Sequence, residues 1–284
     1  MHKDRPIAVI AGGGSLPAQV IEAILNTGRH VITIAIKGEA DASLSSYDPV
    51  ELGWGQIGKL FDTVHKAGAQ EIVLIGSVQR RPDFTSVLGD WGTMRRLPRI
   101  LAALVGGDDS LLVKVMGIFE QEGLKIVGAH EVAPALLAKP GLMAGPKLKE
   151  QDLADIRQCA EAIEKLGALD IGQGCVAVNG RIIAVEGAEG TDAMLLRCVE
   201  LRQNGRVRTK GNAGVLVKCA KPGQDLRVDL PTVGPQTIRN AVSARLNGIA
   251  VEEGNVLIAE RGLTEALCIE HGIFFYGLPK GSGS

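Results

Sequence analysis

The sequence predicts an α/β protein, with a Rossmann-like parallel-sheet domain in its N-terminal half and a mixed α+β domain in its C-terminal half. In the first half, strand-like runs that are almost wholly apolar alternate with helical patterns, as in a parallel sheet covered on both faces. The second half instead shows a hairpin and several short strands among its helices. A length of 284 residues also favours two domains.

Three prolines and two glycines interrupt the chain between residues 131 and 149, where no periodicity is sustained. This composition is typical of a connection between domains. We therefore predict an N-terminal domain over 1–130, a connection over 131–149, a C-terminal domain over 150–280 and a flexible tail over 281–284.

The N-terminal elements follow from their apolar patterns and from the glycines that end them. An apolar run at 7–11 precedes a glycine-rich turn, and apolar residues then repeat at helical spacing from Val20 to Leu25. Ser15 is a candidate N-cap of this helix, and Gly28 ends it. The predicted elements are strand 7–11, helix 16–27, strand 30–36, helix 57–67, strand 71–75, helices 91–105 and 110–122, and strand 124–127.

The C-terminal half begins with an amphipathic helix and a hairpin. Leu153, Ile156 and Ile163 share one helix face, and Asn179-Gly180 between two apolar runs is typical of a type I′ turn. The predicted elements are helix 153–166, strands 175–178 and 181–185, helix 192–203, strands 214–219 and 225–230, helix 237–246, strands 248–251 and 256–259, helix 263–271 and strand 273–276.

The composition is that of an ordinary globular protein and excludes some classes of partner. The net charge is −1 and aromatic residues make up 3%, so both the basic surface and the stacking aromatics of nucleic-acid binders are missing. Five cysteines without CxxC spacing fit a reducing cytoplasm. We expect neither a signal peptide nor a membrane-spanning helix, so any contact with a membrane is peripheral. The apolar content is compatible with a homodimer.

Two turns at strand ends are candidates for phosphate binding. Gly13, Gly14 and Ser15 lie between a strand and a helix, where backbone N–H groups and the helix N-terminus favour an anion. Gly76 and Ser77 follow another strand, and both turns would face the same crevice of a parallel sheet. The pattern departs from the dinucleotide fingerprint at Pro17 and in the absence of an acidic residue directly after Ile36-Lys37. The alternative is a tight turn with no ligand.

An acidic loop follows the predicted hairpin. Glu186, Glu189 and Asp192, with glycines between them, offer oxygen ligands of the kind that Mg²⁺ prefers. Thr191 or Asp192 could equally cap the helix that follows. The glutamates are harder to explain as caps.

The segment 221–235 combines alternating polarity with turn residues at both ends. In a strand, Asp225, Arg227 and Asp229 would share one face and the leucines and valine between them the other. Carboxylates beside a guanidinium suit a metal ion or a water held next to phosphate. The alternative is a half-buried strand whose polar face is simply solvated.

These segments together resemble a known family. Gly12-Gly-Gly-Ser-Leu-Pro, Gly172-Gln-Gly-Cys-Val-Ala-Val, Val185-Glu-Gly-Ala-Glu-Gly-Thr-Asp and the 221–235 segment are similar to those of the LpxI-type UDP-2,3-diacylglucosamine pyrophosphatases of lipid A biosynthesis. The resemblance implies a cytosolic, Mg²⁺-dependent hydrolase with two domains and the substrate held between them. Its products would be UMP and 2,3-diacylglucosamine 1-phosphate (lipid X).

The resemblance also implies that Asp225 is the catalytic carboxylate. The other candidate residues are chosen for their own chemistry, as oxygen ligands for Mg²⁺ or as groups that can bind phosphate. The expected metal ligands are Glu186, Glu189, Asp192, Asp225 and Asp229. The expected substrate-binding residues are Gly13, Gly14, Ser15, Gly76, Ser77, Lys147, Gln173, Gly190, Thr191, Lys221, Gln224, Arg227 and Thr232. Two alternatives stay open: another enzyme that acts on nucleotide sugars, and a nucleotide-sugar-binding regulator without hydrolytic activity.

Overall fold

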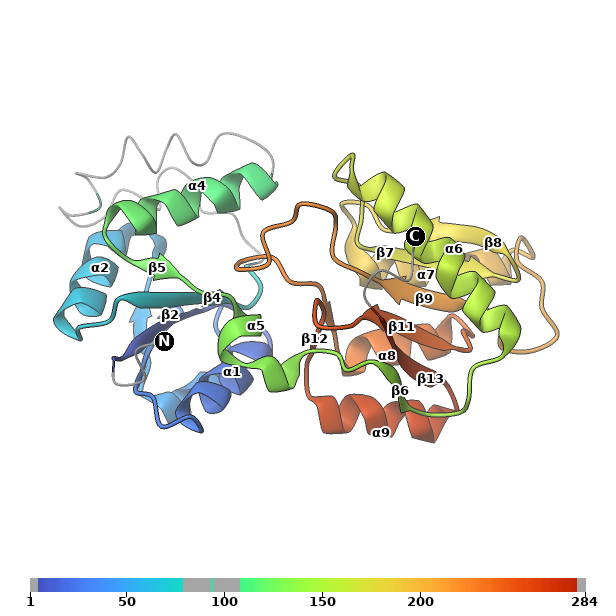
Figure 1. The fold of residues 1–284 in the computed structure, drawn as a ribbon, viewed down its shortest axis with the longest axis horizontal. Helices are drawn as coiled ribbons and strands as arrows, with labels where there is room; N and C mark the ends of the chain where they lie inside the picture. The colour runs from blue at the N-terminus through green and yellow to red at the C-terminus, as the bar shows by residue number, and fades with distance from the viewer. Residues whose placement is uncertain (1–4, 79–92, 94–107, 280–284) are drawn as a thin grey trace. The chain divides into compact units, whose positions relative to one another are not determined.

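The computed structural model describes residues 5–78, 93 and 108–279, and only the backbone of residues 108–112. The chain divides into two compact units, Met1–Ala135 and Leu136–Ser284 (Figure 1). The division lies inside the predicted connection of 131–149. The predicted helix 91–105 lies outside the described residues, apart from Thr93. Each unit is described by itself below.

The first unit is a parallel five-stranded sheet in the order β3-β2-β1-β4-β5. Helices α1 and α5 cover one face, and α2 and α4 cover the other (Figure 1). Every residue of the central strand β1 is buried, as its unbroken apolar sequence predicts. The elements are β1 Ile7–Ala11, α1 Leu16–Leu25, β2 Val31–Ile36, η1 Ala42–Tyr47, β3 Val50–Leu52, η2 Trp54–Gln56, α2 Ile57–Lys66, β4 Glu71–Ile75, α4 Asp108–Gln121, β5 Lys125–Ile126 and α5 Ala129–Val132.

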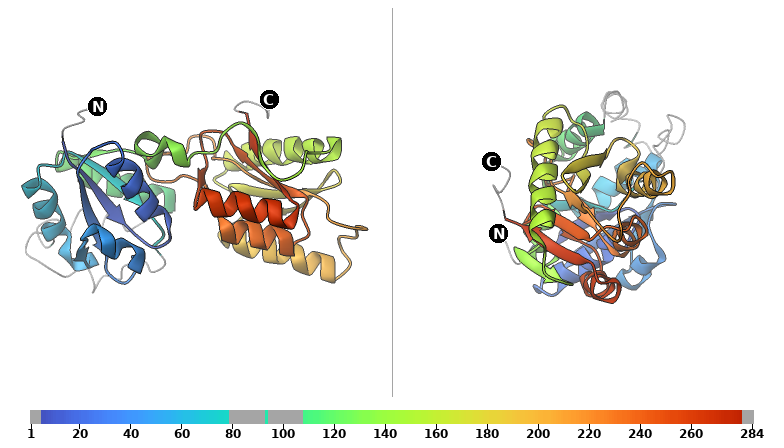
Figure 2. Two further views of the ribbon diagram at one scale, coloured as in Figure 1. Left: turned by 90° about the horizontal axis from the view of Figure 1, so that it is seen from below. Right: turned by 90° about the vertical axis from the view of Figure 1, so that its right-hand side faces the viewer.

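The second unit is a mixed six-stranded sheet in the order β6-β13-β11-β9-β7-β8, beside a small parallel pair, β10 and β12. Helix α6 covers one face, and α7, α8 and α9 cover the other (Figure 2). The two units together confirm the predicted fold class. The elements are β6 Gly141–Ala144, α6 Glu150–Gly167, β7 Gly174–Val178, β8 Arg181–Val185, α7 Gly190–Gln203, β9 Val215–Lys218, β10 Thr232–Val233, α8 Pro235–Ser243, β11 Gly248–Glu252, β12 Leu257–Ile258, α9 Arg261–His271 and β13 Phe274–Leu278, with η3 Pro134–Leu136 before them.

A buried carboxylate of α6 holds the β7–β8 hairpin against the helix. Asn179 and Gly180 both have positive φ, 51° and 79°, as a type I′ turn requires. Their N–H groups donate to Asp155 at 3.0 and 2.6 Å, and the Gln151 side-chain amide donates to the same carboxylate at 3.0 Å. Asp155 is 1% exposed, so these hydrogen bonds replace its hydration.

We expect Asp155→Ala to lower the free energy of unfolding of the second unit by about 1.5–3 kcal/mol, because two turn N–H groups lose a charged acceptor. Chemical denaturation followed by circular dichroism measures this loss. Glu200→Ala, at an exposed position of α7, is the control and should unfold at the native midpoint. Equal midpoints for the two variants would contradict the assignment.

Two sequence predictions need correction. The segment 225–230 is not a strand: the N–H groups of Val228 and Asp229 both donate to the Asp225 carbonyl, at 3.2 and 3.1 Å, and close a turn. The Asp225 side chain also accepts the N–H of Arg227 at 3.1 Å, a local bond with which an aspartate competes against strand pairing. Within the predicted connection, β6 pairs antiparallel with β13 and forms one edge of the second sheet.

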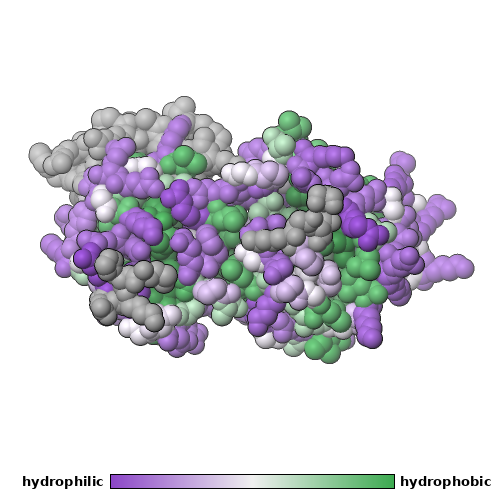
Figure 3. Space-filling model, in the orientation of Figure 1, coloured by the Kyte–Doolittle hydropathy of each residue, from purple (hydrophilic) through white to green (hydrophobic). Residues whose placement is uncertain are grey.

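Exposed apolar side chains occur beside the core in the second unit. Leu142 of β6 and Leu263 and Ile269 of α9 are 44%, 44% and 67% exposed. Figure 3 shows apolar surface over this part of the molecule, while hydrophilic side chains cover much of the rest of that face. Among the described helices, none is both long and apolar enough to cross a bilayer.

Candidate functional site

The turns after β1 and β4 meet, as the sequence predicts for neighbouring strands of a parallel sheet. The N–H of Gly13 donates to the Ser77 carbonyl at 2.8 Å, and the N–H of Ser77 donates to the Gly13 carbonyl at 2.9 Å. A Cβ at Gly76 would lie 2.8 Å from Gly12 C and Gly13 O, so the close approach of the two backbones requires glycine there. Packing of the turns therefore accounts for part of the glycine pattern.

Gly14 is different, because nothing described lies within 4 Å of the position that a Cβ would take. Its N–H, in the turn just before α1, donates to the carboxylate of Asp41, an exposed residue. A phosphate bound at this turn would have to displace that carboxylate. Ser15 stands at the N-cap position of α1 without a capping bond from its side chain.

Asp41 is a residue that the sequence analysis misses. It lies five positions beyond the end of β2 at Ile36, in a loop without regular periodicity. Only the fold places that loop beside the glycine turn.

The acidic loop of the second unit surrounds a buried cation. Lys218, the last residue of β9, is 8% exposed, and its Nζ donates to Thr191 Oγ1 at 2.7 Å. Thr191 Oγ1 donates in turn to Glu186 Oε1 at 2.9 Å. The alternative that Thr191 caps α7 is therefore wrong: α7 begins at Gly190 and has no side-chain cap.

The electrostatics of this cluster centre on the Lys218 ammonium. Burial lowers the pKa of Lys218, and the nearby charges of Glu186, Asp192 and Asp229 oppose that shift. Three of the five predicted metal ligands thus lie close enough to act on one lysine. Lys218 was not predicted as a site residue, because it stands at the end of an apolar run. The available signal was a charged residue directly after three apolar residues of a strand.

One oxygen of the cluster has no hydrogen-bond partner among the described residues. Glu186 Oε2 is buried, and no described residue forms a hydrogen bond to it. The Glu186 side chain lies against Gly174, where any Cβ would overlap it. A buried carboxylate oxygen of this kind calls for a water, a cation or a donor from a ligand.

The other two carboxylates of the acidic loop have ordinary partners. Glu189 forms an ion pair with Arg197 at 2.9 Å, and both side chains are partly exposed. Asp192 Oδ1 accepts the side-chain amide of Asn240 at 2.8 Å. The first contact links the residue before α7 to Arg197 within that helix, and the second links the first turn of α7 to α8.

The loop 221–229 carries the second group of predicted site residues. Arg227 forms a two-pronged contact with Asp225, with Nε to Oδ1 at 2.9 Å and Nη2 to Oδ2 at 2.7 Å. Asp229 Oδ2 accepts the side-chain amides of Gln173, at 3.3 Å, and of Gln224. Lys221 forms an ion pair with Asp170. The structure thus brings Gln173, Gln224 and Asp229 together, beside the Asp225–Arg227 pair.

The remaining two predicted residues, Lys147 and Thr232, lie outside both groups, and Lys147 is at the end of α6 opposite to Gly167, which packs against Lys221. Lys147 is exposed between β6 and α6, and Thr232 begins β10 with its hydroxyl donating to the Leu230 carbonyl at 3.3 Å.

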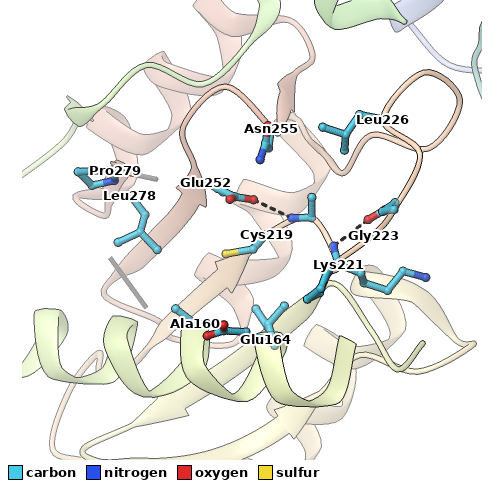
Figure 4. A pocket seen from close by; sticks show the side chains of 14 residues that line it. Ala160, Glu164, Cys219, Lys221, Gly223, Leu226, Glu252, Asn255, Leu278 and Pro279 are labelled. Atoms are coloured by element: carbon cyan, nitrogen blue, oxygen red, sulfur yellow. Dashed lines mark hydrogen bonds between the residues drawn. The ribbon is translucent and has the colours of Figure 1, made fainter. Parts of the chain in front are cut away.

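A cavity of about 420 Å³ opens beside this loop (Figure 4). Ile163, Leu226 and Leu278 give it apolar walls, and Lys221, Glu252 and Asn255 add polar groups. Glu252 accepts the N–H of Ala220 at 3.0 Å and so anchors the start of the loop. Asp225 is not among the lining residues, although its neighbours Gln224 and Leu226 are.

The donor chemistry of the loop fits Mg²⁺. Among the described residues, no three histidine, cysteine or acidic side chains gather closely enough to hold a metal ion between them. Asp225 and Asp229, however, lie one turn apart, since the N–H of Asp229 donates to the Asp225 carbonyl. Mg²⁺ is usually bound through one or two carboxylates together with substrate phosphates, so this pair can suffice.

Known proteins resemble the whole chain. Residues 6–136 match the model of the LpxI N-terminal domain, and residues 139–276 match that of the LpxI C-terminal domain. A protein of Caulobacter vibrioides named UDP-2,3-diacylglucosamine pyrophosphatase LpxI is 38% identical over 274 residues, which cover 96% of this chain and 98% of that protein. The chain belongs to the LpxI family.

Proposed function

We propose that this protein hydrolyses the pyrophosphate bond of UDP-2,3-diacylglucosamine to UMP and 2,3-diacylglucosamine 1-phosphate, in lipid A biosynthesis and with Mg²⁺. The observation that carries the proposal is the 38% identity to a protein named for this activity, across nearly the full length of both chains. The site residues supply compatible chemistry: carboxylates, an arginine and a lysine on one loop.

Asp225 orients or deprotonates the attacking water in this proposal. Its carboxylate is 29% exposed, so water and substrate can reach it, and Arg227 holds it in place. When a phosphate arrives, Arg227 can turn one N–H toward it while still holding Asp225, because a guanidinium has five donors. Lys221 adds positive charge for the same phosphate. Lys147 does not, because it precedes α6 while Lys221 packs against Gly167 at the other end of that helix, about 27 Å away. When bound at Asp225 and Asp229, Mg²⁺ neutralises charge on the phosphate oxygens.

The glycine turns of the first unit bind a phosphate of the substrate in this proposal. Gly14 N–H, now bonded to Asp41, is the donor that a phosphate would take over. Because Asp41 is exposed, it can return to water at little cost. Ser15 and Ser77 offer hydroxyls at the same turns.

The setting of the reaction follows from the substrate. The cysteines are five free thiols, which fits a cytoplasmic protein. A doubly acylated substrate lies in a membrane, so we expect peripheral contact with the inner membrane surface. A homodimer is a further expectation, and the exposed apolar residues of β6 and α9 offer a surface for either contact.

Metal removal tests the proposal. UMP release from UDP-2,3-diacylglucosamine should require Mg²⁺ and stop in EDTA. Asp229→Asn should raise the Mg²⁺ concentration for half-maximal rate by about 10–100-fold, the usual cost of weakening a metal's carboxylate shell. Glu186→Gln should leave that concentration unchanged within about threefold, because Glu186 Oε1 is already held by Thr191, which is itself bonded to Lys218.

Two results would contradict this assignment. UMP release that continues in EDTA would remove the metal from the proposal. A Mg²⁺ requirement shifted by Glu186→Gln and not by Asp229→Asn would place the metal at the acidic loop instead.

A further inference from the structure

Lys218 is a charged residue that is buried inside the second unit. It ends β9 after three buried apolar residues, and its whole side chain is 8% exposed. A lysine is almost never so buried unless it is paired. Within the described residues, the hydrogen bond of its side chain goes to a neutral hydroxyl, Thr191 Oγ1, and not directly to a carboxylate.

The direction of each hydrogen bond in the series from Lys218 to Glu186 follows from which groups can donate. An ammonium can only donate, so the Thr191 oxygen accepts from Lys218. Thr191 must then give its single proton to Glu186 Oε1, 2.9 Å away. The order Lys218, Thr191, Glu186 therefore holds Glu186 as an acceptor, with its second oxygen, Oε2, buried and available.

The same ammonium connects the acidic loop to the loop 221–229. Asp192, in the first turn of α7, and Asp229 both lie close enough for their charges to act on Lys218. Asp229 is held by Gln173 and Gln224 and lies one turn from Asp225. The Lys218 ammonium therefore lies near carboxylates of both loops, while its hydrogen bond leads to Glu186 alone.

We propose that Lys218 is a positioning residue for the hydrolysis: its buried ammonium holds Thr191, and Thr191 in turn fixes the carboxylate of Glu186 beside Gly174. The inference rests on the proposed function, since it assigns Lys218 to that reaction. Lys218 does not touch the reacting phosphate in this account. Its loss should therefore lower kcat much more than it changes KM.

A structural role predicts something different. Breaking a buried pair by removing one charge destabilises a protein, but replacing both partners with neutral groups of similar shape is often neutral or stabilising. If Lys218 only balanced Glu186 within the core, the double variant Lys218→Met/Glu186→Gln would be folded and active. If the unit positions the site, the double variant would be folded and slow.

A double-mutant cycle on Lys218→Met and Glu186→Gln, measured by UMP release and by thermal unfolding, tests the proposal. Each single variant should lose roughly 30-fold in kcat with KM changed by less than about threefold, and the double variant should lose about as much as either single one. The double variant also guards against misfolding of Lys218→Met alone. Lys165→Met/Glu161→Gln, at an exposed ion pair of α6 in the same unit, is the matched control and should keep the native kcat.

Each other outcome overturns the proposal. Losses that multiply to about 1,000-fold in the double variant would mean that the two residues act independently. A double variant with native kcat, or variants that do not fold at all, would make Lys218 structural. If the native protein releases no UMP, the proposed function fails first and this inference fails with it; an active native protein with an active Lys218→Met variant sinks the inference alone.

Discussion

Asp225→Ala is expected to lose roughly 10³-fold or more in kcat for UMP release. A general base alone contributes about 10²–10⁴-fold, and in our account the same carboxylate also holds the metal ion. Fold and stability should change little, because the ion pair that is lost, with Arg227, is partly exposed and such pairs contribute about 1 kcal/mol or less. Steady-state kinetics with thermal unfolding of the same preparations measure both effects.

The control for Asp225→Ala is Glu161→Ala, which removes a carboxylate from an exposed ion pair on α6. It should keep native turnover and show that loss of a surface acid does not itself slow the enzyme. Asp225→Ala with turnover within about threefold of native would remove Asp225 from the mechanism.

The second large effect is expected at Gly76, where the turns after β1 and β4 meet. Its φ is +101°, and a Cβ would lie within 2.9 Å of Gly12, Gly13 and the Pro17 side chain. Overpacking and the left-handed backbone together should make Gly76→Ala cost about 2–5 kcal/mol in the stability of the first unit. Because the change also pushes Gly13 away from Ser77, UMP release should fall with it. Denaturation and kinetics on the variant test this.

Gly28→Ala is the matched control for Gly76→Ala. Gly28 also has positive φ, +80°, but no described atom lies within 4 Å of its would-be Cβ. Its substitution should cost only about 1 kcal/mol, for backbone strain alone. If both variants unfold at the same denaturant concentration, the contact between the two turns does not explain the glycines.

Much of the fold was predictable because its elements carry strong local signals. Strands β1, β2 and β4 of the first sheet are short apolar runs, and β1 is buried at every residue. Asn179-Gly180 adopts the two positive φ angles that its sequence predicts. The meeting of Gly13 and Ser77 also follows from sequence, since strands of one parallel sheet end at the same edge.

The incorrect and missed predictions share one physical cause, because each depends on contacts with residues that are distant in the sequence. Alternation of polarity from Asp225 to Leu230 predicts a strand only if a neighbouring strand accepts its backbone bonds, and here the segment bonds to itself instead. Lys218 looks like a solvated strand end in sequence, yet α7 brings Thr191 over it. Asp41 reaches Gly14 across 27 positions of chain, a contact that no local pattern contains.

The most direct test of the central claim is to identify the products of UDP-2,3-diacylglucosamine after incubation with the purified native protein and Mg²⁺. Our account predicts UMP and 2,3-diacylglucosamine 1-phosphate in equal amounts, because the pyrophosphate bond is the bond that breaks. UDP together with free diacylglucosamine would show that the bond between the sugar and its phosphate breaks, on either side of the bridging oxygen, and would contradict it. An unchanged substrate would contradict it as well and would leave a nucleotide-sugar-binding regulator as the better description.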